Sequence, residues 1–129
     1  MNNQEHLLQL AENVASNAYA PYSRLKVGAA ISTPTGNFYT GCNVENISFP
    51  NGTCAETGAI SAMISAGDNQ IAEILIYADS PTLITPCGAC RQRILEFATP
   101  NTIVHIANST GIKQSFSLSE LIPNSFKEF

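Results

Sequence analysis

Two short cysteine segments limit what this chain can fold into more than any other feature of its sequence. The first is Cys54-Ala55-Glu56, and the second, farther along the chain, is Pro86-Cys87-Gly88-Ala89-Cys90. A structural zinc site normally takes four protein ligands, whereas a catalytic site takes three and leaves one position for water. Three thiols with one nearby carboxylate therefore predict a catalytic zinc site, and the fold must bring the two segments together.

Both segments lie where a loop runs into a helix-forming stretch. The apolar spacing predicts helices over residues 54–66 and 88–98. A helix N-terminus presents unpaired N–H groups and about half a unit of positive charge, which favours the thiolate form that binds zinc. Two helices that aim their N-termini at one point would bring Cys54, Cys87 and Cys90 around one cation.

Glu56 lies two residues after Cys54, in the first turn of its predicted helix. From there its carboxylate can face the open metal position and transfer a proton without binding the metal. Two alternatives stay open. Glu56 would be a carboxylate that only stabilises the helix N-terminus, or Cys87 and Cys90 would form a redox pair, which leaves Cys54 and Glu56 unexplained.

A closed structural zinc site would need a fourth soft ligand, and Cys42, His6 and His105 are the only spare candidates. We expect His6 on the solvent-facing side of a helix and His105 as a hydrogen-bonded histidine inside a strand. Cys42, at a strand end, is expected to be a small buried apolar residue. The open, catalytic form of the site is therefore favoured.

The composition fits one domain over residues 1–129. Hydrophobic residues make up 44% and charged residues 12%, which suffices for a core and hints that some surface is buried between subunits. The net charge is −4 and the six Lys and Arg residues form no cluster, so a polymeric nucleic-acid partner is disfavoured.

The sequence has no run of roughly 20 apolar residues that would span a bilayer, and no basic start followed by an apolar stretch. We therefore expect a cytoplasmic protein that does not associate with a membrane. Cysteines in that reducing compartment serve metals or catalysis, whereas a two-disulfide framework would suit a smaller secreted chain.

The remaining elements alternate between helices and strands. The pattern predicts a helix over residues 5–19, strands over residues 27–33, 38–42, 71–78, 102–107 and 112–116, and a short helix around Glu120. Strand–helix–strand alternation is typical of an α/β fold, in which helices pack on the faces of a mixed sheet.

Two further segments are Tyr19-Ala20-Pro21-Tyr22-Ser23 and Gly41-Cys42-Asn43-Val44-Glu45-Asn46. Together with the two cysteine segments, the second of which continues as Arg91-Gln92, they closely resemble the cytidine deaminase family, specifically its small homotetrameric class. The resemblance runs from the first helix to Leu121-Ile122-Pro123. It implies a three-layer sandwich with a five-stranded mixed sheet and helices on both faces. It also implies one zinc per subunit and active sites completed by neighbouring subunits of a homotetramer.

By this resemblance, Cys54, Cys87 and Cys90 bind zinc and Glu56 is the proton shuttle. The implied reaction is hydrolytic deamination of cytidine and 2′-deoxycytidine to uridine and 2′-deoxyuridine in pyrimidine salvage. An activated water attacks C4, Glu56 protonates N3 and the departing amine, and ammonia leaves. A related deaminase of a cytosine-containing antibiotic such as blasticidin S, and a non-catalytic zinc or redox module, are the alternatives.

The resemblance also implies residues that bind the substrate. Asn43 and Glu45 would hold the ribose hydroxyls, the Ala55 backbone would hold the pyrimidine edge, and Phe126 would stack on the base in a neighbour's site. Without the family, the first pair would be a turn asparagine and a solvated glutamate. Phe126 would then be a C-terminal core residue, and Phe129 competes for its role.

Two positions depart from the commonest family form. Thr57 stands where many members carry an arginine that donates to the thiolates, and Leu25 stands where a phenylalanine usually faces the substrate. Three thiolates on one zinc ion leave a net charge of −1. We therefore expect this site to lack its usual balancing arginine, with compensation from the helix dipoles or from Arg91 if it folds inward. Leu25 keeps an apolar contact with the substrate and loses the aromatic ring face.

Overall fold

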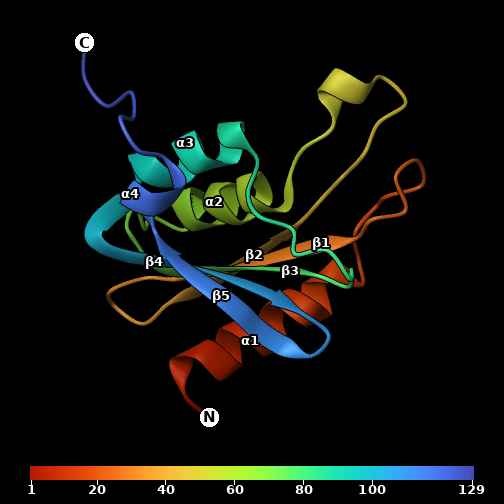
Figure 1. The fold of residues 1–129 in the computed structure, drawn as a ribbon, viewed down its shortest axis with the longest axis horizontal. Coiled ribbons are helices and arrows are strands. Elements are labelled where there is room, and N and C mark those ends of the chain that lie inside the picture. Colours follow the sequence, from red (N-terminus) through yellow and green to blue (C-terminus); the bar gives the residue numbers. More distant parts are fainter.

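A five-stranded sheet forms the centre of the fold in the computed structural model, which describes residues 1–129 (Figure 1). The elements are α1 (Asn3–Ala15), β1 (Val27–Ser32), β2 (Phe38–Cys42), the 3-10 helix η1 (Phe49–Asn51), α2 (Ala55–Ser65), β3 (Ile71–Ala78), α3 (Gly88–Glu96), β4 (Ala98–Asn108), β5 (Gly111–Ser117) and α4 (Leu118–Leu121). Helix α1 covers one face of the sheet, and α2, α3 and α4 cover the other (Figure 1). The predicted three-layer α/β sandwich is confirmed.

The sheet is mixed, with the strand order β2-β1-β3-β4-β5. Only β3 and β4 run parallel, and α3 supplies the crossover that a parallel pair requires. Side chains alternate across the sheet, so Ile74 and Ile76 pack under α2 and α3, while Leu75 and Tyr77 pack under α1. Both cysteine-bearing helix starts therefore belong to the same layer.

Helix α2 can lie close to β2 because position 41 is glycine. A Cβ at Gly41 would lie 2.2 Å from the backbone nitrogen of Ala59 and 2.5 Å from the carbonyl oxygen of Ala55. Such distances exclude any other residue unless the helix moves. This contact sets the position of the α2 N-terminus over the sheet, and with it the positions of Cys54 and Glu56.

Helices α1 and α3 end earlier than predicted. Helix α1 ends at Ala15 rather than at residue 19, because Tyr19 pairs with the chain after β2: its N–H donates to the Asn43 carbonyl at 3.0 Å, and its carbonyl accepts from the Glu45 N–H at 2.8 Å. Helix α3 ends at Glu96, and the next residues join β4. No helix of the structure combines the length and the apolar character needed to cross a bilayer.

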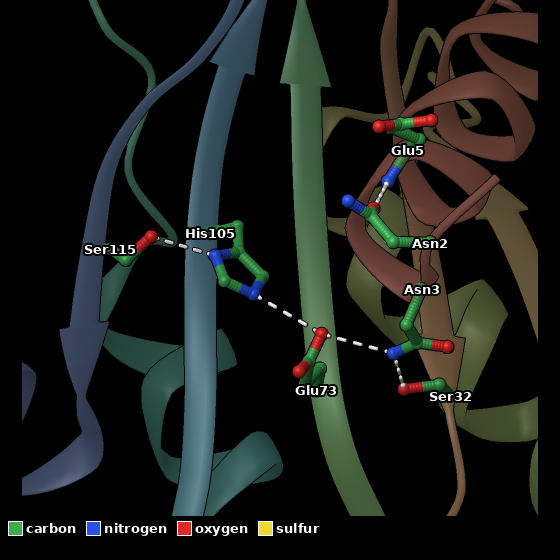
Figure 2. Close-up of polar contacts among 7 residues, drawn as sticks. All are labelled: Asn2, Asn3, Glu5, Ser32, Glu73, His105 and Ser115. Carbon is green, nitrogen blue, oxygen red and sulfur yellow. Dashed lines mark hydrogen bonds and ion pairs between the residues drawn. The ribbon is translucent and has the colours of Figure 1, made fainter.

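His105 lies between Glu73 and Ser115 (Figure 2). Its side chain is on the α1 face of β4, because the flanking Val104 and Ile106 pack on the opposite face with α2 and α3. His105 is 2% exposed, with Nδ1 2.7 Å from Ser115 Oγ and Nε2 3.3 Å from Glu73 Oε2. Asn3 Nδ2 donates to the same Glu73 oxygen at 3.1 Å. The prediction of a hydrogen-bonded strand histidine is confirmed, and His105 cannot supply a fourth metal ligand.

The other two spare donors also lie apart from the cysteine group. His6 is half-buried rather than solvent-facing, because its ring packs on Phe38 with centroids 4.3 Å apart. Cys42 is half-buried at the end of β2 rather than fully buried as predicted.

Candidate metal centre and active site

The three cysteines of the two motifs meet at the N-termini of α2 and α3. Cys54 is the N-cap residue of α2, Cys87 is the N-cap residue of α3, and Cys90 lies in the first turn of α3. Their sulfur atoms lie within 4.8 Å of one another, and no fourth His, Cys, Asp or Glu joins the group. Tetrahedral zinc with bonds of about 2.3 Å needs sulfur atoms roughly 3.8 Å apart, so the three thiols fit one zinc ion after a small adjustment. The donor set agrees with an open site.

The three thiols differ in pKa because their surroundings differ. Hydrogen bonding to the backbone N–H of Cys90 lowers the pKa of Cys87. Burial raises the pKa of Cys54, and burial together with the Glu56 carboxylate raises the pKa of Cys90 to about 12. A helix N-terminus therefore favours one thiolate here, and the other two ionise when a cation binds and displaces their protons.

Glu56 is buried beside the thiols, with 5% of its surface exposed. Burial raises the pKa of its carboxyl, against the opposing effects of its own backbone N–H and of the Arg93 charge. A buried carboxyl whose pKa is raised above its ordinary value is suited to accept and return protons during a reaction.

Arg93 reaches the metal group, whereas Arg91 does not. Arg93 Nη1 donates to Cys90 Sγ at 3.5 Å, and Thr57 Oγ1 lies 4.0 Å from the same sulfur. Arg91 turns away and donates through Nε to the Pro86 carbonyl at 2.8 Å. Arg91 therefore does not fold inward to balance the thiolates, and the expectation of a site without an arginine is wrong because Arg93 reaches Cys90. The overlooked signal was the i, i+3 spacing of Cys90 and Arg93, which places both side chains on one helix face.

A cavity of about 590 Å³ opens beside the thiols, a volume typical of small-molecule sites. Four predicted site residues line it together with Cys54 and Cys87: Asn43, Glu45, Ala55 and Glu56. Its remaining wall consists of Tyr22, Ser23, Val27, Val44, Asn46, Phe49, Gly52, Thr53, Ile76, Ile84 and Thr85. Neither Leu25 nor Phe126 lines the cavity within one chain, and Phe126 is 65% exposed near the C-terminus.

Asn43 and Glu45 are held by the loop that precedes β1. Asn43 Nδ2 donates to the Leu25 carbonyl at 2.8 Å, and its Oδ1 accepts from the first N–H of β1 at 2.8 Å. Glu45 Oε1 accepts from the N–H groups of Tyr22 at 2.9 Å and Ser23 at 3.1 Å, and the Ser23 hydroxyl donates to Oε2. The Ser23 hydroxyl is the main cause of the lowered pKa of Glu45. Both side chains keep unused hydrogen-bonding capacity at the cavity wall.

Comparison with known proteins identifies the family. The sequence profile of the cytidine and deoxycytidylate deaminase zinc-binding region matches residues 1–106. The chain belongs to this family. The cytidine deaminase of Halalkalibacterium halodurans is 38% identical over 120 residues, which cover 93% of this chain and 91% of that protein. The cytidine deaminase of Mycoplasma genitalium is 34% identical over 127 residues, or 98% of this chain and 97% of that protein.

Solved structures agree with the assignment to the cytidine and deoxycytidylate deaminase family. The crystal structure of the Burkholderia pseudomallei cytidine deaminase has a TM-score of 0.90 and 38% identity, covering 98% of this chain and 100% of that one. The crystal structure of the Mycobacterium tuberculosis cytidine deaminase has a TM-score of 0.83 and 31% identity, and the match covers 99% of this chain and 100% of that one. The predicted family, fold class, zinc cofactor and hydrolytic deaminase class are thereby confirmed.

Proposed function

We propose that this protein hydrolyses cytidine and 2′-deoxycytidine to uridine and 2′-deoxyuridine with release of ammonia, as an enzyme of pyrimidine salvage. The position of Glu56 carries the proposal: a buried carboxylate lines the same cavity as Cys54 and Cys87. The similarity to proteins named cytidine deaminase supports the same reaction.

In the proposed mechanism Glu56 moves the protons. A zinc ion held by Cys54, Cys87 and Cys90 would supply Lewis-acid activation of a water molecule. Glu56 takes one proton from the attacking water and delivers it to N3 of the pyrimidine. It then takes the second proton from the new hydroxyl on C4 and passes it to the amine, so that the C4–N bond breaks, ammonia leaves and the C4 carbonyl forms. The backbone of Ala55, which lines the same cavity, would hold the pyrimidine edge during these transfers.

We assign the ribose hydroxyls to Asn43 and Glu45. The Glu45 carboxylate accepts from a sugar hydroxyl, and the Asn43 amide can donate or accept. Ser23 and the Leu25 carbonyl fix these two side chains before a ligand arrives, so little side-chain entropy is lost on binding. The Leu25 side chain is proposed to contact the substrate in the assembled oligomer.

The proposed assembly is a cytoplasmic homotetramer in which neighbouring chains complete each site. Its support is the set of large apolar side chains left exposed near the cavity and at the C-terminus: Ile47 at 80%, Phe49 at 73% and Phe126 at 65%. Exposed apolar surface is one of the features that mark contact with another protein chain. Phe126 would then stack on the base bound in a neighbouring chain.

A substrate panel on purified, zinc-loaded protein tests the proposal. Cytidine, 2′-deoxycytidine, cytosine, adenosine and blasticidin S are incubated separately, and ammonia and ring absorbance are followed. We expect ammonia from the two cytosine nucleosides and none from the other three compounds. Ammonia from blasticidin S alone would assign an antibiotic substrate, and no ammonia from any compound would favour a non-catalytic zinc module.

A further inference from the structure

Arg93 has one polar partner within the chain, and that partner is a metal-binding thiol. Its Nη1 donates to Cys90 Sγ at 3.5 Å, and it forms no ion pair, although Glu96 lies one turn along the same helix. Cys90 is completely buried, whereas Arg93, one turn farther along the same face of α3, is exposed. The Arg93 guanidinium therefore donates inward to the Cys90 sulfur, although it is exposed to solvent and Glu96 lies on the same helix.

The negative charge of the zinc–thiolate group explains how this contact would stabilise the site. Three thiolates exceed the charge of one Zn²⁺ ion by one unit, and the Glu56 carboxylate adds another negative charge beside them. A guanidinium N–H that donates to a ligating thiolate offsets part of this charge and holds the ligand in place. Arg91 is not available, because each of its three guanidinium nitrogens donates elsewhere: to the Pro86 carbonyl, the Leu121 carbonyl and the Thr85 hydroxyl.

Position 57 approaches the same sulfur from the other helix. Thr57 Oγ1, on α2, lies 4.0 Å from Cys90 Sγ, while Arg93 reaches that atom from α3. An arginine at either position would therefore serve the same thiolate. Two arginines at once would place like charges on both sides of it.

We propose that Arg93 is a positioning residue of the zinc centre, which holds Cys90 and balances the charge of the zinc–thiolate group. It takes from α3 the role that an arginine at position 57 would take from α2. The inference rests on the proposed function, because it concerns the same zinc centre. The proposal requires that an arginine at position 57 on α2 can replace Arg93 on α3 and still hold Cys90 and balance the charge.

The test moves the arginine and measures zinc release. Arg93→Gln, Arg93→Lys, Thr57→Arg and the double variant Thr57→Arg/Arg93→Gln are loaded with zinc, and its transfer to a colorimetric chelator is timed. Lys113→Gln removes an exposed charge from β5 and serves as the control. We expect Arg93→Gln to release zinc about 10-fold faster or more, with Arg93→Lys between it and the unmodified protein. The double variant should return close to the unmodified rate.

Two further measurements separate an effect on the Cys90 ligand from a general loss of structure. Thermal unfolding of the zinc-loaded variants reports the stability of the fold, and the thiolate-to-metal charge-transfer band after cobalt substitution reports the metal–sulfur bonds. If Arg93→Gln does not fold, Arg93→Lys and the double variant carry the comparison. Zinc release at the unmodified rate from the first variant, or release from the double variant as fast as from Arg93→Gln, overturns the assignment. A different result would be that the variants release zinc at the expected rates while the unmodified protein deaminates no nucleoside. That result would overturn the proposed function and leave the role of Arg93 at the zinc centre standing.

Discussion

Ser23 donates twice to the Glu45 carboxylate, through its backbone N–H to Oε1 at 3.1 Å and through its hydroxyl to Oε2. The pair joins the loop before β1 to the loop after β2, and both loops border the cavity. Because these bonds lower the pKa of Glu45, its carboxylate is ionised and oriented before any ligand binds. The Glu45 carboxylate is therefore a preformed hydrogen-bond acceptor at the cavity wall.

Ser23→Ala should weaken nucleoside binding more than it slows turnover. Loss of one hydrogen bond to the carboxylate frees Glu45 to rotate, so we expect the KM for cytidine to rise about 3- to 10-fold with little change in kcat. Because the pKa of Glu45 is lowered, its carboxylate stops contributing to nucleoside binding only when the pH falls through that lowered pKa. In the variant the pKa of Glu45 rises, and the increase in KM on acidification should begin at a higher pH. Steady-state kinetics across a pH series measure this, with Ser109→Ala as an exposed control; identical KM profiles would contradict it.

Substitutions at two facing glycines should have opposite effects. Gly41→Ala places a Cβ 2.2 Å from the Ala59 nitrogen, so α2 must shift, at a cost of about 1–3 kcal/mol in the free energy of unfolding. A Cβ at Gly58 meets Gly41 Cα at 3.4 Å, an ordinary contact, so Gly58→Ala should stabilise α2 by up to about 1 kcal/mol. Chemical denaturation of both variants measures the difference. Equal stabilities would show that the α2–β2 contact is not what positions the helix.

Local signals explain what could be predicted from the sequence. Loops that run into apolar stretches placed Cys54 and Cys87 at helix starts, and strand–helix alternation led to the correct layers. Tyr19 was assigned to a helix because its pairing with the Asn43–Glu45 backbone is a tertiary contact, invisible in local spacing.

The arginine that reaches Cys90 was missed for a similar reason. Arg91 and Arg93 are both close to Cys90 along the chain, and the choice between them depends on which acceptors the fold presents. The Pro86 and Leu121 carbonyls attract Arg91, and Arg93 is left to reach the thiolate.

Zinc affinity should increase with pH. Burial raises the pKa of Cys54 and of Cys90, so protons on these thiols compete with zinc until the pH rises or the metal displaces them. We expect proton release on binding and a weaker affinity at pH of about 6 than at about 8. Calorimetric titration of metal-free protein in two buffers of different ionisation enthalpy measures both. Cys42→Ala, outside the metal group, should behave as the unmodified protein; binding without proton release would contradict this account.

Deamination by the unmodified protein and by Glu56→Gln, compared at equal zinc content, tests the central claim most directly. Glu56 lies outside the metal group, so the variant should retain zinc at the same stoichiometry. Loss of the proton shuttle should lower kcat for cytidine by about 10²–10⁴-fold or more. In the unmodified enzyme, activity should fall on acidification at a pH above 4.5, the ordinary pKa of a glutamate, because burial raises the pKa of this carboxyl. We predict that the zinc-loaded unmodified protein forms uridine and ammonia in equal amounts, and that the formation of both products is nearly abolished in Glu56→Gln. Equal rates for the two proteins, or no uridine from a fully zinc-loaded unmodified chain, would contradict it.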